Sequence, residues 1–127
     1  ALERVKAAVR GVSYEPILGD AVAAIRRHPW ARWWIFGGAS GDNAHETNIA
    51  TIRDGIAACR ETGAAPFVKQ LGSRPIISHY DLSAEAFRLL DASGWTEFDG
   101  PPCLQHPKGG DWHEWTNDLR VREFPRG

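Results

Sequence analysis

The residues best suited to chemistry stand at the ends of apolar runs. Glu15 follows VSY, the glycine-rich stretch 37–41 (GGASG) follows WWIF, and Lys69 with Gln70 follows PFV. A carboxylate can act as a general base, and a lysine can bind an anion. Glycine lets backbone N–H groups approach a phosphate or carboxylate closely. We therefore predict a ligand site with Glu15 and Lys69 as its charged groups, formed by Glu15, Gly37, Gly38, Ser40, Gly41, Lys69 and Gln70.

Each of these features also has a purely structural explanation. Residues 37–41 suit a tight turn between a strand and a helix, and they match neither the dinucleotide-binding pattern, the phosphate loop nor the G-x-S-x-G nucleophile turn. Glu15 suits a surface or helix-capping carboxylate, and it is also a candidate ion-pair partner for Lys69. The sequence leaves ligand binding and these structural roles open, and it assigns no catalytic residue.

The histidines and cysteines do not predict a metal site. Cys103 and His106 have the spacing of a ligand pair, but the chain offers no second pair of matching spacing. Cys59 falls on the apolar face of a predicted helix, which favours a place in the core. We expect no metal ligand in this chain.

Alternating strands and helices must position the site. The pattern predicts strands at 12–17, 30–38 and 65–72 and helices at 20–28 and 48–62. The middle strand, WARWWIFGG, is the most apolar run and is predicted to be buried on both faces. This order is typical of a parallel α/β sheet, in which ligands bind beyond the carboxyl ends of the strands.

The chain is predicted to form a single α/β domain, with a βαβαβ part at 1–72 and a helix and loop-rich tail at 73–127. A helix is predicted at 2–9 and another at 83–93, followed by a long irregular segment at 99–115. The tail carries aromatic and basic residues that could stack on bases, or could instead seal the underside of this segment. They are Trp112, Trp115, Arg120 and Arg122.

Composition excludes several classes of protein. The 127 residues are 43% hydrophobic and 24% charged, with a net charge of -1, which is typical of one globular domain and gives no overall basic field for nucleic acid. Two cysteines cannot form a disulfide framework. We find no signal peptide or membrane span, so the expected location is the cytoplasm.

Four stretches together resemble a known family. They are VSYEPILG, WWIFGGASG, PFVKQLG and KGGDWHEWTNDLRVREFP, and their shared phrases read EPxLG, GGxSG, FxKQxG and WxxxLRxRxxP. They are similar to the carboxyl half of a phage- and prophage-encoded family of unknown function that is related to radical S-adenosylmethionine enzymes. The likeness covers most of the chain apart from about 73–107.

The resemblance implies a partial TIM-barrel-like fold in which these three strands are the later part of the barrel, with the predicted site facing its mouth. The family's acidic residue after the glycine pair is Ala39 here, and its cluster of three cysteines has no counterpart. S-adenosylmethionine and an iron–sulfur cluster would therefore be bound only if a longer protein or a partner supplies the cysteines. Three strands cannot close a barrel. We therefore expect either a fragment of a longer protein or a partial barrel whose sheet edges are covered by its tail, by a second copy or by a partner chain.

Three functional hypotheses follow from these observations. In the first, the chain contributes a small-molecule pocket to a radical-SAM-like barrel and is not catalytic alone. In the second, it is an interaction module that uses its tail on nucleic acid or a protein. In the third, it is a small hydrolase or transferase with Glu15 as general base. The sequence names neither the substrate nor the reaction, and it leaves open whether the chain is an enzyme.

Overall fold

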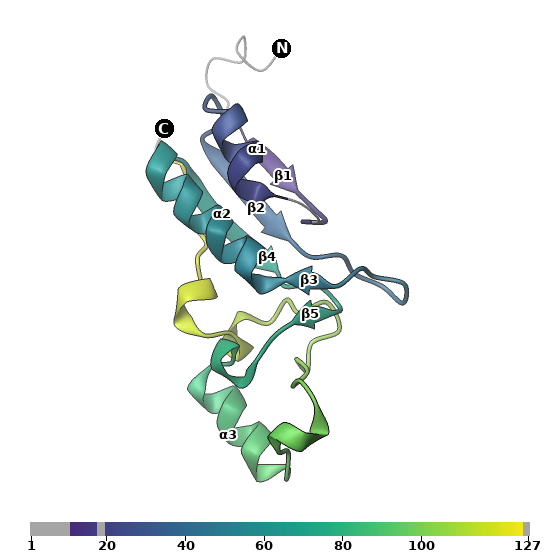
Figure 1. The fold of residues 1–127 in the computed structure, drawn as a ribbon. Helices are drawn as coiled ribbons and strands as arrows, with labels where there is room; N and C mark the ends of the chain where they lie inside the picture. The colour runs from purple at the N-terminus through teal and green to yellow at the C-terminus, as the bar shows by residue number, and fades with distance from the viewer. Residues whose placement is uncertain (1–10, 18–19, 126–127) are drawn as a thin grey trace.

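A three-stranded parallel sheet with two helices forms the larger part of the computed structural model, which describes residues 11–17 and 20–125 (Figure 1). The strand order is β1-β2-β4, and both pairs of neighbours are parallel. This confirms the predicted α/β class and its partial βαβαβ order. The elements are β1 (Gly11–Tyr14), α1 (Ala21–Arg27), β2 (Trp33–Gly37), α2 (Ile49–Thr62) and β4 (Ala65–Gln70).

Local capping residues set the ends of the two helices. The Asp20 side chain accepts a hydrogen bond from the Ala23 N–H at 3.1 Å and begins α1. Asn48 accepts from the Ala50 N–H at 3.0 Å and begins α2. Helix α2 ends at Gly63, whose φ of 79° is in the left-handed region that glycine adopts readily. The helix boundaries predicted from these residues are therefore confirmed.

The sheet is buried on one face only. Trp34, Phe36 and Val68 are buried against the helices, and Phe36 lies so close to Gly55 of α2 that a Cβ there would come within 2.9 Å of the Phe36 ring. The side chain of Ile35, which points to the opposite face of β2, is only partly buried. The prediction that the middle strand is buried on both faces is therefore wrong. In the described part of the chain, both helices pack on the same face and no second helical layer covers the other.

The two edges of the sheet differ. The C-terminal tail covers the β4 edge, where the Val68 N–H donates to the Val121 carbonyl at 2.7 Å and the Glu123 N–H donates to the Pro66 carbonyl at 3.0 Å. The opposite edge is β1, which pairs only with β2 among the described residues. The tail therefore closes one edge of the sheet, and none of the described residues covers the other edge.

A smaller unit extends from the carboxyl ends of the strands. It contains a short parallel pair, β3 (Thr47–Asn48) with β5 (Pro75–Ile76), which the sequence did not predict. Helix α3 (Ala84–Ala92) confirms the predicted helix, although none of its residues is buried. Figure 1 shows α3 at the end of the molecule away from β1. The helix predicted at 2–9 lies outside the described residues.

Arg53 of α2 connects the two units. Its Nη2 lies 2.7 Å from Oδ1 of Asp81, and its Nε lies 2.6 Å from Oδ2 of Asp118. The hydrogen bond that Arg53 donates to the Asp118 carboxylate is the largest cause that raises the pKa of Arg53 above its usual value. The Asp81 side chain is only 11% exposed, so its charge depends on Arg53 for compensation.

We expect Arg53→Ala to lower the free energy of unfolding by about 1–3 kcal/mol, since it leaves the buried carboxylate of Asp81 without its cation. Urea denaturation measures this loss. The matched control is Arg26→Ala, which breaks a pair with Glu61 whose side chains are both more than half exposed. That control is expected to cost about 0–1 kcal/mol. Equal losses in the two variants would contradict the role given to Arg53.

Candidate functional site

Three of the predicted site residues meet at the carboxyl ends of the strands. Glu15 follows β1, Lys69 lies in β4, and the Lys69 Nζ is 3.5 Å from Oε1 of Glu15. Gly37 lies between them on β2, and a Cβ there would be 2.8 Å from Cγ of Glu15. The lack of a side chain at Gly37 therefore lets the Glu15 side chain lie across the end of β2.

Gly38 and Gln70 join the ends of β2 and β4. The Gln70 Nε2 donates to the Gly38 carbonyl at 3.0 Å, and the Gly38 N–H donates to the Gln70 carbonyl at 3.3 Å. Both partners are thus engaged within the protein. Gly38 and Gln70 therefore have a structural role at the strand ends, and we do not propose them as ligand contacts.

Ser40 and Gly41 belong to an exposed loop beyond β2. Gly41 has a φ of 102°, and its N–H donates to Oγ of Ser73 at 3.0 Å. Its contact is therefore with the segment after β4. The structure shows no direct contact of either residue with the Glu15–Lys69 pair in the described part of the chain.

A hollow of about 410 Å³ lies on the uncovered face of the sheet, next to the Glu15–Lys69 pair. Alternate residues of the three strands line it, including Ser13, Trp33 and Phe67. Such alternation is a property of every strand, because successive side chains point to opposite faces. The sequence does not single out these residues, because an apolar run such as the middle strand predicts burial on both faces.

Two tail residues complete this hollow, and no spacing in the sequence indicates them. Arg122 and Phe124 both line it, and Arg122 forms an antiparallel bridge with Phe67. The Trp33 Nε1 donates to the Glu123 carbonyl at 2.9 Å, which holds this part of the tail against the sheet.

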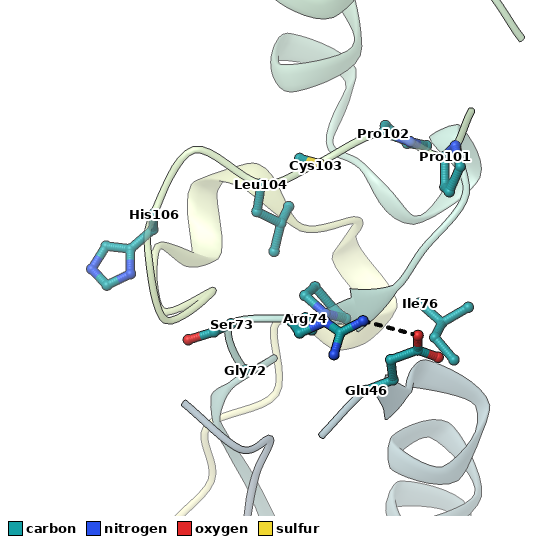
Figure 2. Close-up of a pocket in the computed structure, with 11 residues that line it drawn as sticks. Glu46, Gly72, Ser73, Arg74, Ile76, Pro101, Pro102, Cys103, Leu104 and His106 are labelled. Carbon is teal, nitrogen blue, oxygen red and sulfur yellow. Dashed lines mark hydrogen bonds and ion pairs between the residues drawn. The ribbon is translucent and has the colours of Figure 1, made fainter. Parts of the chain in front are cut away.

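A second cavity, of about 450 Å³, lies between the segment around β5 and residues 101–106 (Figure 2). Its charged pair, Arg74 with Glu46, is joined at 3.3 Å. Arg74 also donates to the Ala44 carbonyl at 3.3 Å. Arg74 and Glu46 therefore join two loops of the protein. Because their charges are already paired, we do not propose this cavity as the primary ligand site.

The candidate metal pair does not converge. Figure 2 shows the His106 ring pointing away from Cys103. The His106 Nδ1 accepts hydrogen bonds from the N–H groups of Lys108 and Gly110, both at 3.1 Å, so that nitrogen is engaged in a local turn. Among the described residues, no group of three or more His, Cys, Asp and Glu side chains could hold a metal ion.

The other cysteine is not placed to act as a nucleophile. Cys59 is fully buried, and burial raises the pKa of its thiol to about 12. The thiol is therefore protonated at neutral pH, and the reactive thiolate form is scarce. This agrees with the predicted place of Cys59 in the core.

The aromatic and basic residues of the tail make internal contacts. Trp115 is fully buried. The Arg120 Nε donates to the Trp112 carbonyl at 2.8 Å and to the Trp115 carbonyl at 3.0 Å. These contacts agree with the sealing role, and none of them favours stacking on bases, so the interaction module stays a prediction.

Comparison with known proteins assigns a family. The family described as Protein of unknown function (DUF5131) matches residues 1–99. The chain belongs to this family. The DUF5131 match includes the strand ends that carry Glu15 and Lys69, whereas Arg122 and Phe124 lie beyond it. Neither the curated proteins nor the solved structures contain a match to the chain.

The DUF5131 chain shows no element suited to crossing a bilayer: none of the helices in its described part combines the length and the apolar character that this requires.

Proposed function

We propose that this chain is the later half of a radical-SAM-like barrel and forms one wall of a small-molecule pocket. In a barrel of this type the helices lie outside the strands, and the ligand binds at the carboxyl ends of the strands, next to the inner face. The uncovered face of the β1-β2-β4 sheet corresponds to such an inner face. The proposal rests on the family membership, on the resemblance of the strand ends and on this one-sided sheet.

The observation that carries the proposal is the difference between the two sheet edges. The tail covers β4, whereas β1 pairs only with β2 in the part of the chain that the structure describes, so its outer edge is available there to a further strand. Additional parallel strands would therefore join at β1. They would enclose the hollow beside Glu15 and Lys69 and exclude water from it.

The described residues do not fit an iron–sulfur cluster. A cluster is held by cysteine thiolates, but Cys59 is buried in the core and Cys103 lies in the irregular segment before His106. We therefore derive no catalytic step for this chain. Its own contribution is to hold and orient a ligand, with Glu15 and Lys69 as the charged groups of the wall.

The sequence of the encoding DNA upstream of the Ala1 codon tests this proposal. We expect an in-frame segment that includes Cys-x-x-x-Cys-x-x-Cys, which would supply the three thiolates that this chain lacks. A start codon directly before Ala1 would overturn the proposal, because the strands and the cysteines would then be missing from the polypeptide.

A further inference from the structure

The strand-end side of the hollow has more positive than negative charge. Lys69 and Arg122 line it as cations, and Glu15 is its carboxylate. Lys69 is 56% exposed and contacts Glu15 at 3.5 Å, a long ion pair that leaves the lysine free to turn toward a ligand. The charges of Lys69, Arg122 and Glu15 add up to one positive charge, so a ligand with one negative charge would neutralise them.

Arg122 is fixed in place without being neutralised. Its Nε donates to the Val68 carbonyl at 3.0 Å and its Nη2 donates to the Lys69 carbonyl at 2.9 Å. Its guanidinium carbon lies 5.6 Å from the centre of the Phe67 ring and 5.2 Å from that of Trp112. All of these partners are uncharged, so the positive charge of Arg122 is available to an anion at the hollow.

Three aromatic side chains, with Ser13 and Ile35, line the remainder of the hollow. The ring centres of Trp33, Phe67 and Phe124 lie 5.5–5.9 Å apart. The hydrogen bond from the Trp33 indole to the Glu123 carbonyl fixes the orientation of the largest ring. The Trp33 and Phe67 rings meet at 86° and the Phe67 and Phe124 rings at 70°, so a flat apolar body can stack on one ring and meet the edge of another. Pockets of this composition bind small molecules with few polar contacts.

We infer that the ligand has a flat apolar body and a carboxylate head group. The body lies on Trp33, Phe67 and Phe124, and the carboxylate lies between Lys69 and Arg122. This inference rests on the proposed function, since it uses the same wall of the pocket. A head group with a single negative charge fits better than a doubly charged phosphate, because the net charge of the three ionic groups is one positive charge.

Three probes with one body and different heads test the charge preference. They are indole-3-acetate, indole-3-acetamide and tryptamine, titrated at millimolar concentration into the ¹⁵N-labelled chain while the Trp33 indole N–H signal is followed by NMR. We expect the tightest binding for the acetate and the weakest for the amine. Equal affinities for the three probes would overturn the carboxylate assignment.

Two substitutions with opposite expected signs separate this effect from damage to the fold. Lys69→Gln is expected to weaken acetate binding about two- to fivefold, because it removes a cation beside the carboxylate. Glu15→Gln is expected to strengthen binding by a similar factor, because it removes a competing negative charge. Both effects are modest because both side chains are partly exposed. The control is Arg74→Gln in the second cavity, which should leave acetate binding unchanged. An unchanged acetate affinity in Lys69→Gln would contradict the inference.

The same titrations distinguish the inference from the proposed function. If all three probes move the Trp33 signal equally, the pocket wall is supported and only the carboxylate assignment fails. If no probe moves that signal, the uncovered face binds no flat ligand and the inference fails, whereas the proposed function is decided separately by the DNA sequence upstream of the Ala1 codon.

Discussion

Replacing Gly38 with alanine is expected to lower the free energy of unfolding by about 3 kcal/mol. A Cβ at this position would overlap Oγ1 of Thr47 and the carbonyl oxygen of Leu71. Neither can move easily, because Thr47 is 1% exposed and the Leu71 N–H is held by the Gly109 carbonyl at 3.0 Å. The substitution would also separate the ends of β2 and β4 that position Lys69. Urea denaturation followed by circular dichroism measures the loss.

The control for Gly38→Ala is Gly11→Ala. A Cβ at Gly11 would meet the Trp33 side chain at 3.4 Å, an ordinary van der Waals contact. We therefore expect this second variant to stay within about 0.5 kcal/mol of the wild type, or to be slightly more stable, since alanine restricts the unfolded chain more than glycine does. If the two variants lose the same stability, close packing at Gly38 is not the cause.

Replacing Trp115 with alanine is expected to cost about 3–5 kcal/mol, the usual range for removing a large aromatic ring from a core. Trp115 is fully buried, and its backbone forms an antiparallel bridge with that of Leu82. Its ring centre also lies 5.6 Å from the guanidinium carbon of Arg122. Loss of the ring would release the tail from the β4 edge, and urea denaturation measures the change.

Phenylalanine at position 115 provides the matched variant. The Trp115 Nε1 is buried and has no hydrogen-bond partner, so its removal relieves an unsatisfied donor while most of the ring is kept. We expect Trp115→Phe to cost about 1 kcal/mol or less. A stability for Trp115→Ala within about 1 kcal/mol of the wild type would show that the tail does not depend on this side chain.

The order of elements could be predicted because the deciding signals are local. Asp20, Asn48 and Gly63 mark helix ends through their own hydrogen-bonding or conformational preferences, and the structure uses them as predicted. The placement of Glu15 near Lys69 also followed from the sequence, because parallel strands bring their carboxyl ends to one edge of the sheet.

The uncovered face of the sheet could not be predicted in the same way. The run that contains Trp33, Ile35 and Phe36 is apolar on both sides, so hydrophobicity alone cannot tell a covered face from an open one. The contribution of Arg122 and Phe124 depends on a tail that returns to β4 from more than 50 positions away, as the contact with Val68 shows. Long-range pairing of this kind leaves no periodic pattern in the sequence.

In the described part of the chain, the sheet has one covered face and one covered edge, and its other face and edge are uncovered. Helices cover one face and the tail closes β4, while residues 11–17 and 20–125 leave the outer edge of β1 and the hollow beside Glu15 and Lys69 uncovered. In the proposed barrel, both open features have the same cause: they are the places where the earlier strands join and enclose the ligand.

Amide hydrogen exchange in β1 tests this central claim most directly. The measurement compares the 127-residue chain with the polypeptide translated from the whole reading frame, and it follows the N–H groups of residues 11–14 that β2 does not engage. We predict fast exchange in the shorter chain and strong protection in the longer one, because a further strand then pairs with β1. Equal exchange in the two polypeptides would contradict the account.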